Sequence, residues 1–326
     1  MLNAKTRQKG KYKAVIIGAG KIATQFDSPK SKKVLTHAHA YYKHPKVDLI
    51  GFYDINKPTA SRAAKKWHCR VFFDFKKMLD NVKPDIISIC TPDENHFDTL
   101  LKISKYKPRI VICEKPITTN LKDTQKIVNL YKKIRIPVLV NYSRRFDKTV
   151  QTVKKNIAQG KYGKVLCASG IYTKGIVHNG SHMIDLGRFL FGEVKKSLVL
   201  HTVSGSIKND KNIAGFLEFK ICKQFHLMAG DEKKFSIFEL DIILEKKRVK
   251  FFDFGLQISL QNVEKDPLYK GYKSLGKPTI IKTAFMDALP ELIENAINSI
   301  EKNKPLRCSL EDAFKTQKAC FSLLNK

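Results

Sequence analysis

Six short apolar runs, each ending in turn residues, lie within roughly the first 140 residues and are the sequence feature that most constrains the fold. Polar stretches with helical spacing separate most of them, such as the one from Thr119 to Ile134. Continuous apolar strands that alternate with helices are typical of a parallel sheet covered on both faces. We therefore predict a doubly wound α/β domain. The runs are KAVIIGAG, VDLIGFYD, VFF, DIISICTP, RIVICEKP and PVLVNY.

The pattern changes near Asn141 to Phe146. A helical stretch from Lys148 to Gln159 leads to the strand KVLCASGIYT and then to a second helix from about Gly180 to Phe191. Several β-rich segments joined by short turns follow, which predicts an antiparallel sheet. Two helical patterns, Thr283 to Ile300 and Ser309 to Leu324, close the chain.

The length of 326 residues exceeds what one hydrophobic core usually organises, so we expect two domains, at residues 1–145 and 146–326. No apolar run approaches the roughly 18 residues needed to span a bilayer. The basic first segment, MLNAKTRQKGKYK, lacks the apolar stretch of a signal peptide. These features predict a cytoplasmic protein with no membrane partner.

The net charge of +31 invites a nucleic-acid interpretation. The lysines are scattered through both halves, however, and form no single arm or stripe. We therefore do not expect nucleic acid as a partner, although the charge favours anionic ligands. The seven cysteines contain no C-x-x-C pair, which indicates buried thiols in a reducing compartment rather than a zinc site.

The stretch AVIIGAGKIA joins the first strand to a G-x-G-x-x-A motif and a predicted helix. Gly18 allows a tight turn, Gly20 lets the backbone approach a pyrophosphate, and Ala23 allows close helix packing. A tight strand–helix turn without a ligand is the alternative. We assign Gly18, Gly20, Lys21 and Ile22 to a dinucleotide site.

Asp54 ends the second strand, where an acidic residue would accept hydrogen bonds from the adenosine ribose. A carboxylate there repels a 2'-phosphate, so NAD is favoured over NADP. The spacing from the glycines exceeds the usual 20 or so residues. An insertion around FDSPKSKKVLT, starting at Phe26, accounts for the surplus; its lysines either approach an anionic substrate or form a solvated loop.

CTPDENH and CEKP follow the fourth and fifth predicted strands, at the edge where open α/β sheets bind ligands. Their residues Thr91, Pro92, His96, Glu114 and Lys115 complete the predicted cofactor site. Lys115, flanked by a proline that fixes the backbone, can hold a substrate hydroxyl and favour its alkoxide. Solvated surface is the alternative for any single lysine.

The stretch GIVHNGSHMID places His178, His182 and Asp185 close together in sequence. A helix from about Gly180 puts His182 and Asp185 on one face, so the carboxylate could support the imidazole. Acid/base use of His182, structural hydrogen bonding and a facial set of metal ligands are all compatible with these residue types.

VIIGAGKIA, CTPDENH, CEKP, NYSRRF and the histidine helix, in this order, resemble the Gfo/Idh/MocA oxidoreductases. The resemblance implies a Rossmann domain followed by an α/β domain with a large, mostly antiparallel sheet, commonly oligomerised through that sheet. It makes Lys115 and His182 the catalytic pair and implies no metal. In the family pattern D-x-G-x-H-x-x-D, Asp185 matches the last aspartate, whereas His178 replaces the first.

These features together predict an NAD-dependent oxidoreductase that moves a hydride between the nicotinamide and a carbinol carbon of a sugar. Lys115 would polarise the hydroxyl, His182 would exchange its proton, and Asp185 would support His182. We expect Arg144 and His178 to join the substrate site, with Arg145 near anionic groups or at the surface. The positive charge favours a nucleotide-linked or acidic sugar.

The expected partners are a sugar-type substrate and further copies of the chain, as a dimer or tetramer. The main alternative is a non-catalytic regulator of the same fold that senses a dinucleotide. A regulator would not need both Lys115 and His182, so their presence favours an enzyme. Direct nucleic-acid binding is a third possibility, and its affinity would fall steeply with added salt.

Overall fold

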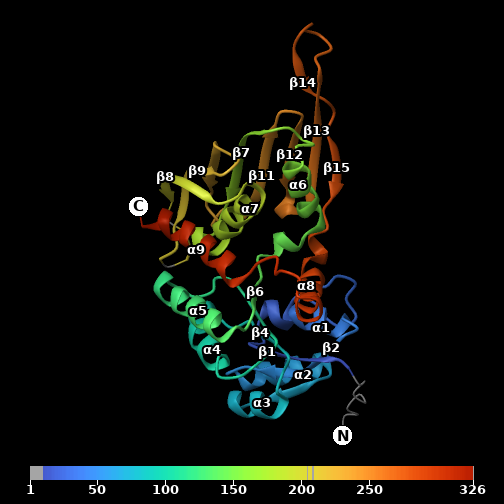
Figure 1. Cartoon of the computed structure of the whole chain (residues 1–326), viewed down its shortest axis with the longest axis vertical. Coiled ribbons are helices and arrows are strands. Elements are labelled where there is room, and N and C mark those ends of the chain that lie inside the picture. Colours follow the sequence, from blue (N-terminus) through green and yellow to red (C-terminus); the bar gives the residue numbers. More distant parts are fainter. Residues whose placement is uncertain (1–9, 204, 208, 326) are drawn as a thin grey trace. The chain divides into compact units, whose positions relative to one another are not determined.

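A computed structural model describes residues 10–203, 205–207 and 209–325. The chain forms two compact units (Figure 1), one with residues up to Ser143 and Met286–Phe314, the other with Arg144–Phe285 and the residues from Lys315 onward. The expected boundary after residue 145 lies close to the point between Ser143 and Arg144 where the chain first passes from one unit to the other. Residues 286–314, which we expect in the second domain, lie in the first unit.

The first unit is built on a six-stranded parallel sheet in the order β3-β2-β1-β4-β5-β6. The predicted doubly wound sheet is therefore confirmed, and its strand order reverses between β1 and β4. Every residue of β4 and β5 is buried, as expected of a sheet covered on both faces. The strands are β1 (Tyr12–Ile17), β2 (Val47–Tyr53), β3 (Arg70–Phe72), β4 (Ile86–Ile89), β5 (Ile110–Cys113) and β6 (Val138–Val140).

The helices of this unit begin at residues whose side chains cap them. Thr36, Asn56, Asp74 and Asn120 each accept a hydrogen bond from a backbone N–H three residues further on. The capped helices are α1 (His37–Lys43), α2 (Lys57–Trp67), α3 (Phe75–Val82) and α5 (Leu121–Ile134). The others are α4 (His96–Ile103), α8 (Ala288–Lys302) and the short turns η1 (Lys21–Gln25), η2 (Asp93–Asn95) and η6 (Phe285–Asp287).

Helix α8 belongs to the first unit because its apolar face packs against α1 and β5. Leu292, Ile293 and Ala296 are fully buried on that face. Two side-chain contacts add to the attachment: His44 hydrogen-bonds to Glu294 at 3.1 Å, and Lys46 forms an ion pair with Glu301 at 2.7 Å. These contacts join residues about 250 positions apart, which periodicity along the chain could not reveal.

The second unit contains a nine-stranded sheet in the order β14-β13-β12-β11-β7-β10-β9-β8, with β15 paired to β13. Among the described strands of this sheet, β7 and β10 pair in parallel and the other pairs are antiparallel, so the predicted mostly antiparallel sheet is confirmed. We had not expected the short strands β14 and β15. The strands are β7 (Val165–Tyr172), β8 (Val194–Val203), β9 (Asn212–Phe219), β10 (Phe225–Ala229), β11 (Phe238–Leu244), β12 (Lys247–Phe252), β13 (Gln257–Lys265), β14 (Lys273–Leu275) and β15 (Thr279–Lys282).

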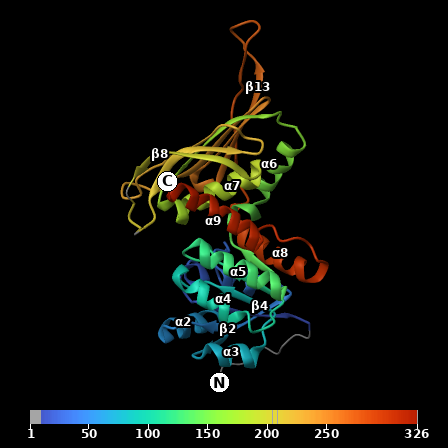
Figure 2. The ribbon, with the colours of Figure 1, turned by 60° about the vertical axis from the view of Figure 1, so that its left-hand side comes forward.

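Helices α6 (Lys148–Ala158) and α7 (Ser181–Phe191) cover one face of this sheet (Figure 2). Alternate side chains of β7, β9 and β11 point into the core beneath them. Phe191, Phe219 and Phe225 meet there with ring centroids 5.2–6.3 Å apart. Helix α9 (Leu310–Leu324) adds Ala319, Cys320 and Leu323 to the same core. The turns η3 (Ser143–Phe146), η4 (Gly175–Gly180) and η5 (Asp253–Gly255) complete the elements.

Candidate active site

The glycine turn after β1 lies against the ends of β2 and β4. Gly18 has a φ of +89°, and an ideal Cβ there would lie 2.6 Å from the carbonyl carbon and oxygen of Cys90. A Cβ at Gly20, in contrast, would meet no heavy atom within 4 Å. The fold itself therefore requires glycine at position 18, whereas Gly20 leaves open space beside the turn. Open space is what a pyrophosphate needs to approach the backbone.

Asp54 follows β2 directly and faces the glycine turn. One carboxylate oxygen accepts a hydrogen bond from the Ala19 N–H at 2.7 Å, and the other accepts one from the Asn56 N–H at 2.8 Å. The carboxylate thus lies beside the turn, where a ribose-binding acid is expected. Its part in cofactor binding stays a prediction.

Lys21 and Ile22 lie in η1, which has only five residues and is shorter than the helix we had predicted. The chain then enters the insertion that begins at Phe26. Buried Asp27 organises this segment, since it accepts hydrogen bonds from the backbone N–H groups of Leu35 and Thr36 and binds Nδ1 of His39. The insertion is therefore anchored to the unit, while its lysines are exposed: Lys30, Lys32 and Lys33.

His96 is buried and joins the loops after β4 and β5. Its Nδ1 lies 2.7 Å from the carbonyl oxygen of Pro116, and its Nε2 lies 3.0 Å from that of Thr91. Both ring nitrogens therefore contact backbone, so any role in cofactor binding would act through the position of these loops. Within the part of the chain that the structure describes, the buried Thr91 hydroxyl has no hydrogen-bond partner. Pro92, beside it, is exposed.

Glu114 is held by two residues that the sequence did not single out. Its Oε1 lies 2.9 Å from His37 Nε2 and accepts a hydrogen bond from the Asn141 amide at 2.7 Å. Burial alone would raise the pKa of Glu114, but His37, Asn141 and the charge of Lys115 lower it below its ordinary value. Glu114 thus positions the backbone that carries Lys115, which is partly exposed and precedes a cis bond to Pro116.

In the second unit, His178 lies in η4 and His182 in the first turn of α7. Two glycines let α7 approach the sheet. A Cβ at Gly187 would lie 2.6 Å from the Phe219 ring, and one at Gly170 would lie 2.6 Å from the Met183 sulfur. The helix that carries His182 is therefore tightly packed on β7 and β9. His182 itself is partly exposed.

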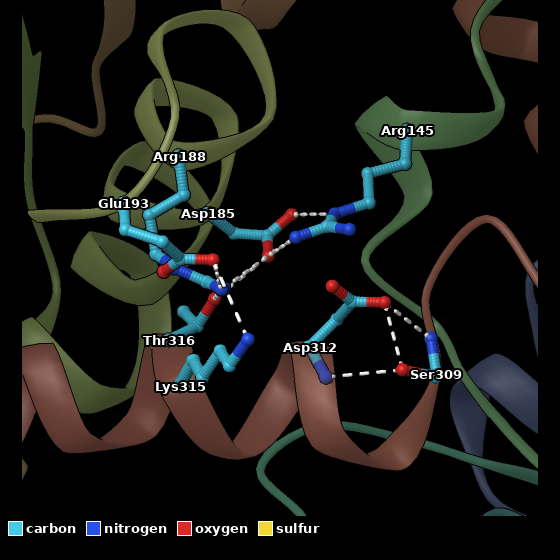
Figure 3. A network of polar contacts seen from close by, with 8 residues as sticks. All are labelled: Arg145, Asp185, Arg188, Glu193, Ser309, Asp312, Lys315 and Thr316. Atoms are coloured by element: carbon cyan, nitrogen blue, oxygen red, sulfur yellow. Dashed lines mark hydrogen bonds and ion pairs between the residues drawn. The ribbon is translucent and has the colours of Figure 1, made fainter. Parts of the chain in front are cut away.

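The carboxylate of Asp185, which we expect to support His182, is bound by residues of other segments. It accepts two hydrogen bonds from the Arg145 guanidinium, both at 2.8 Å, and one from the Thr316 hydroxyl at 2.8 Å (Figure 3). Arg188 lies 3.8 Å away and pairs with Glu193. Asp185 therefore ties α7 to α9 and to the segment that precedes α6. A buried carboxylate needs a cation beside it, and Arg145 supplies that cation to Asp185.

The two arginines of NYSRRF consequently differ. Arg145 is buried in its pair with Asp185 and is not at the surface. Arg144 stacks its guanidinium 3.4 Å from the centroid of the Phe238 ring and donates a hydrogen bond to the Phe254 carbonyl oxygen at 3.2 Å. A substrate contact by Arg144 stays a prediction.

Asp210 is a further residue that sequence reasoning did not single out, in addition to His37 and Asn141. It lies in the polar turn before β9, and its carboxylate is 2.7 Å from Nδ1 of His178. The segment KNDKN gave no signal beyond that of an ordinary turn. Only the fold shows that this turn reaches η4.

Residues 10–203, 205–207 and 209–325 contain neither a cluster of metal ligands nor a membrane-spanning helix. No group of three or more His, Cys, Asp or Glu side chains gathers as metal ligands do. No helix in these ranges has the length and apolar composition to cross a membrane. The absence of a metal from the reaction remains a prediction of the resemblance.

A family model described as "Oxidoreductase family, NAD-binding Rossmann fold" matches residues 12–142. D-glucoside 3-dehydrogenase of Escherichia coli (strain K12) is 23% identical over 188 residues, 54% of this chain and 50% of that protein. Myo-inositol 2-dehydrogenase of Thermotoga maritima is 20% identical over 271 residues, 74% of this chain and 77% of that protein. The chain thus aligns with only half the length of the glucoside enzyme.

Two solved structures share the fold over almost the whole chain. An oxidoreductase of Desulfitobacterium hafniense described as NADPH-dependent has a TM-score of 0.80 at 16% identity, covering 98% of this chain and 96% of that one. UDP-N-acetylglucosamine 3-dehydrogenase of Acidithiobacillus ferrooxidans has a TM-score of 0.72 at 16% identity, covering 96% of each. Residues 12–142 thus match the NAD-binding Rossmann fold of an oxidoreductase family, and the fold of almost the whole chain is shared with these two structures. The resemblance to the Gfo/Idh/MocA oxidoreductases that the sequence shows is matched by this family model over residues 12–142.

The Arg145–Asp185 pair should be a major support of the second unit. Arg145→Met removes the cation that donates two hydrogen bonds to the buried carboxylate and leaves Arg188 at 3.8 Å, so we expect the free energy of unfolding in urea to fall by about 3 kcal/mol. Arg248→Met is the matched control, because its pair with Asp241 is partly exposed and should be worth at most about 1 kcal/mol. Equal losses in the two variants would contradict a structural role for Asp185.

Proposed function

We propose that the protein is an NAD-linked dehydrogenase that acts on a carbinol carbon of a sugar or sugar derivative. The observation that carries this proposal is the gathering of the glycine turn, Asp54 and Lys115 at the carboxyl edge of one parallel sheet. The names of the glucoside, inositol and UDP-N-acetylglucosamine dehydrogenases support the sugar class. The net charge of +31 favours an acidic or nucleotide-linked sugar.

The residues at this edge fit a dinucleotide. Gly20 leaves room for the pyrophosphate, and the buried Thr91 hydroxyl, which has no partner among the described residues, can bond to the ligand. The Asp54 carboxylate favours NAD, since it would repel a 2'-phosphate. When bound, NAD would take up a hydride from the carbinol carbon, and the protein would supply orientation and proton transfer.

Lys115 and His182 divide the work on the substrate hydroxyl. An ordinary lysine is charged at neutral pH, so Lys115 donates a hydrogen bond and stabilises the developing alkoxide. His182 accepts the hydroxyl proton at a ring nitrogen and returns it in the reverse reaction. Asp185 contributes indirectly, because its bonds to Arg145 and Thr316 fix the helix that carries His182.

A dinucleotide-sensing regulator of the same fold is the alternative. Such a protein would bind NAD but would not need a proton-exchanging pair beside it. The presence of both Lys115 and His182 therefore favours the enzyme. The two hypotheses separate in a screen of nucleotide sugars, free sugars and cyclitols with NAD, followed by the absorbance of NADH.

Substitution of either catalytic residue should lower turnover steeply, while the glycine turn and Asp54, which are unaltered, should still bind NAD. Lys115→Met should lose alkoxide stabilisation and positioning, while His182→Asn should lose mainly proton transfer, typically about 100- to 10,000-fold in kcat. The measurements are kcat against pH with a substrate found in the screen and NAD affinity by fluorescence. Parental turnover and pH profile in His182→Asn would show that this histidine is structural.

Asp54 should set the choice between the two nicotinamide cofactors. Asp54→Ala removes the repulsion toward a 2'-phosphate, so the ratio of NAD to NADP affinity should fall. It also removes the bond from the Ala19 N–H, so Asp54→Asn, which keeps an acceptor, is the control for the geometry of the turn. Tighter binding of NADP than of NAD by the unaltered protein would overturn the assignment.

We further propose that the protein forms a dimer or tetramer through its large sheet. The face turned away from α7 carries an apolar patch across β8, β9 and β10, in which Leu198 is 57% and Leu200 is 64% exposed. Phe216 of β9 lies opposite Leu198, His226 of β10 lies opposite Phe216, and Met228 follows two residues further along β10. Contiguous apolar surface of this kind is typical of interfaces.

Charges placed in this patch should therefore separate the subunits. We expect the Leu198→Glu, Leu200→Glu double variant to sediment as a monomer at concentrations at which the parent is a dimer or tetramer. Leu268→Glu is the control, since Leu268 is 83% exposed in the loop between β13 and β14. A monomeric parent, or a double variant with the parental mass, would refute this interface.

A further inference from the structure

Asp210 makes three hydrogen bonds to two consecutive residues of η4. One carboxylate oxygen accepts from the Val177 N–H at 2.9 Å. The other accepts from the His178 N–H at 2.9 Å and lies 2.7 Å from Nδ1 of the same histidine. The side chain of Asp210 is 5% exposed, whereas that of His178 is 34% exposed. A buried carboxylate therefore holds a partly exposed imidazole.

The contact is built into the fold on both sides. Gly175 has a φ of +74°, and an ideal Cβ there would lie 2.1 Å from the Asp210 carboxylate, so the turn closes only around glycine. The Gly175 N–H donates to the Asn212 side chain at 2.7 Å, and the Ile176 N–H donates to the Lys211 carbonyl at 2.9 Å. The segment from Asp210 to Asn212 thus satisfies four successive backbone donors of η4. This arrangement keeps the carboxylate in one place.

The chemistry of the pair fixes the state of the imidazole. An ionised carboxylate can only accept hydrogen bonds, so Nδ1 of His178 carries the proton. In the neutral ring, Nε2 is then an acceptor. The bond to Asp210 also sets the ring plane, as carboxylate partners of histidine do in other sites. His178 lies four residues before His182, at the start of the same helical segment.

We propose that Asp210 is a positioning residue of the substrate site: it holds His178 with Nε2 as the acceptor for a second hydroxyl of the sugar. This inference rests on the proposed function, in which His182 serves the reacting hydroxyl. The carboxylate acts through the histidine and does not touch the substrate. A substrate with two neighbouring hydroxyl groups fits this arrangement.

The tautomer of His178 tests the first step without any substrate. In a ¹⁵N-histidine-labelled parent, at a pH well above the ordinary pKa of histidine, the His178 signals should show a proton on Nδ1. His178→Phe identifies these signals by their loss. A proton on Nε2 instead would overturn the proposal, whatever reaction the protein catalyses.

A double-mutant cycle tests the second step. Asp210→Asn should lower kcat/KM about 10- to 100-fold on a sugar identified in the screen, the range typical when a histidine loses its orienting partner. In the His178→Phe background the same change should have little further effect, because Asp210 acts through the histidine. Equal losses in both backgrounds would mean that Asp210 is merely structural.

Ligand binding separates failure of this inference from failure of the proposed function. If no sugar is turned over, the probes are myo-inositol and UDP-N-acetylglucosamine added with NAD. A shift of the His178 Nε2 signal on addition would support the contact even without turnover, whereas no shift with any sugar would overturn it. The tautomer measurement uses the unaltered chain, so the test stands even if Asp210→Asn does not fold.

Discussion

The cofactor edge of the first unit depends on how closely the backbone of Gly18 approaches the end of β4. A side chain at Gly18 would overlap the Cys90 carbonyl, so β1 and β4 can end side by side only around glycine. Strand order reverses between these two strands, which is where such sheets bind ligands. The contact therefore sets where Thr91 meets the glycine turn. His96 carries the alignment one strand further, because it contacts the carbonyls of Thr91 and Pro116.

Carboxylates, although outnumbered 30 to 61 by lysine and arginine, position much of the candidate site. Glu114 fixes the backbone before Lys115, Asp185 fixes α7, and Asp210 fixes η4. Each is paired with a histidine or arginine from a distant segment. A buried charge without its partner costs free energy, so the two segments must pack in the arrangement that forms the pair. In this strongly basic chain, the less numerous carboxylates therefore position these segments of the candidate site.

Local patterns predicted the glycine turn and the strands of both sheets except β14 and β15, because these signals lie within about ten neighbouring residues. Local patterns could not predict contacts between segments that are far apart in the sequence. The attachment of α8 to α1, the bond between His37 and Glu114 across 77 residues and the bond between Thr316 and Asp185 across 131 residues leave no periodic trace. The i, i+3 spacing of His182 and Asp185 was read correctly as one helix, but spacing alone could not show that Arg145 takes the carboxylate.

The segment that carries both histidines is therefore held from outside at each end. Asp210 and Asn212 bind its first turn, and Arg145 and Thr316 bind Asp185 within α7. The histidines lie between these anchors, so their positions depend on residues from the turn before β9, the start of the second unit and α9. Asp210 thus places a carboxylate beside the histidine at position 178. This acid comes from the turn before β9, so the position of the histidine depends on how that turn packs against η4.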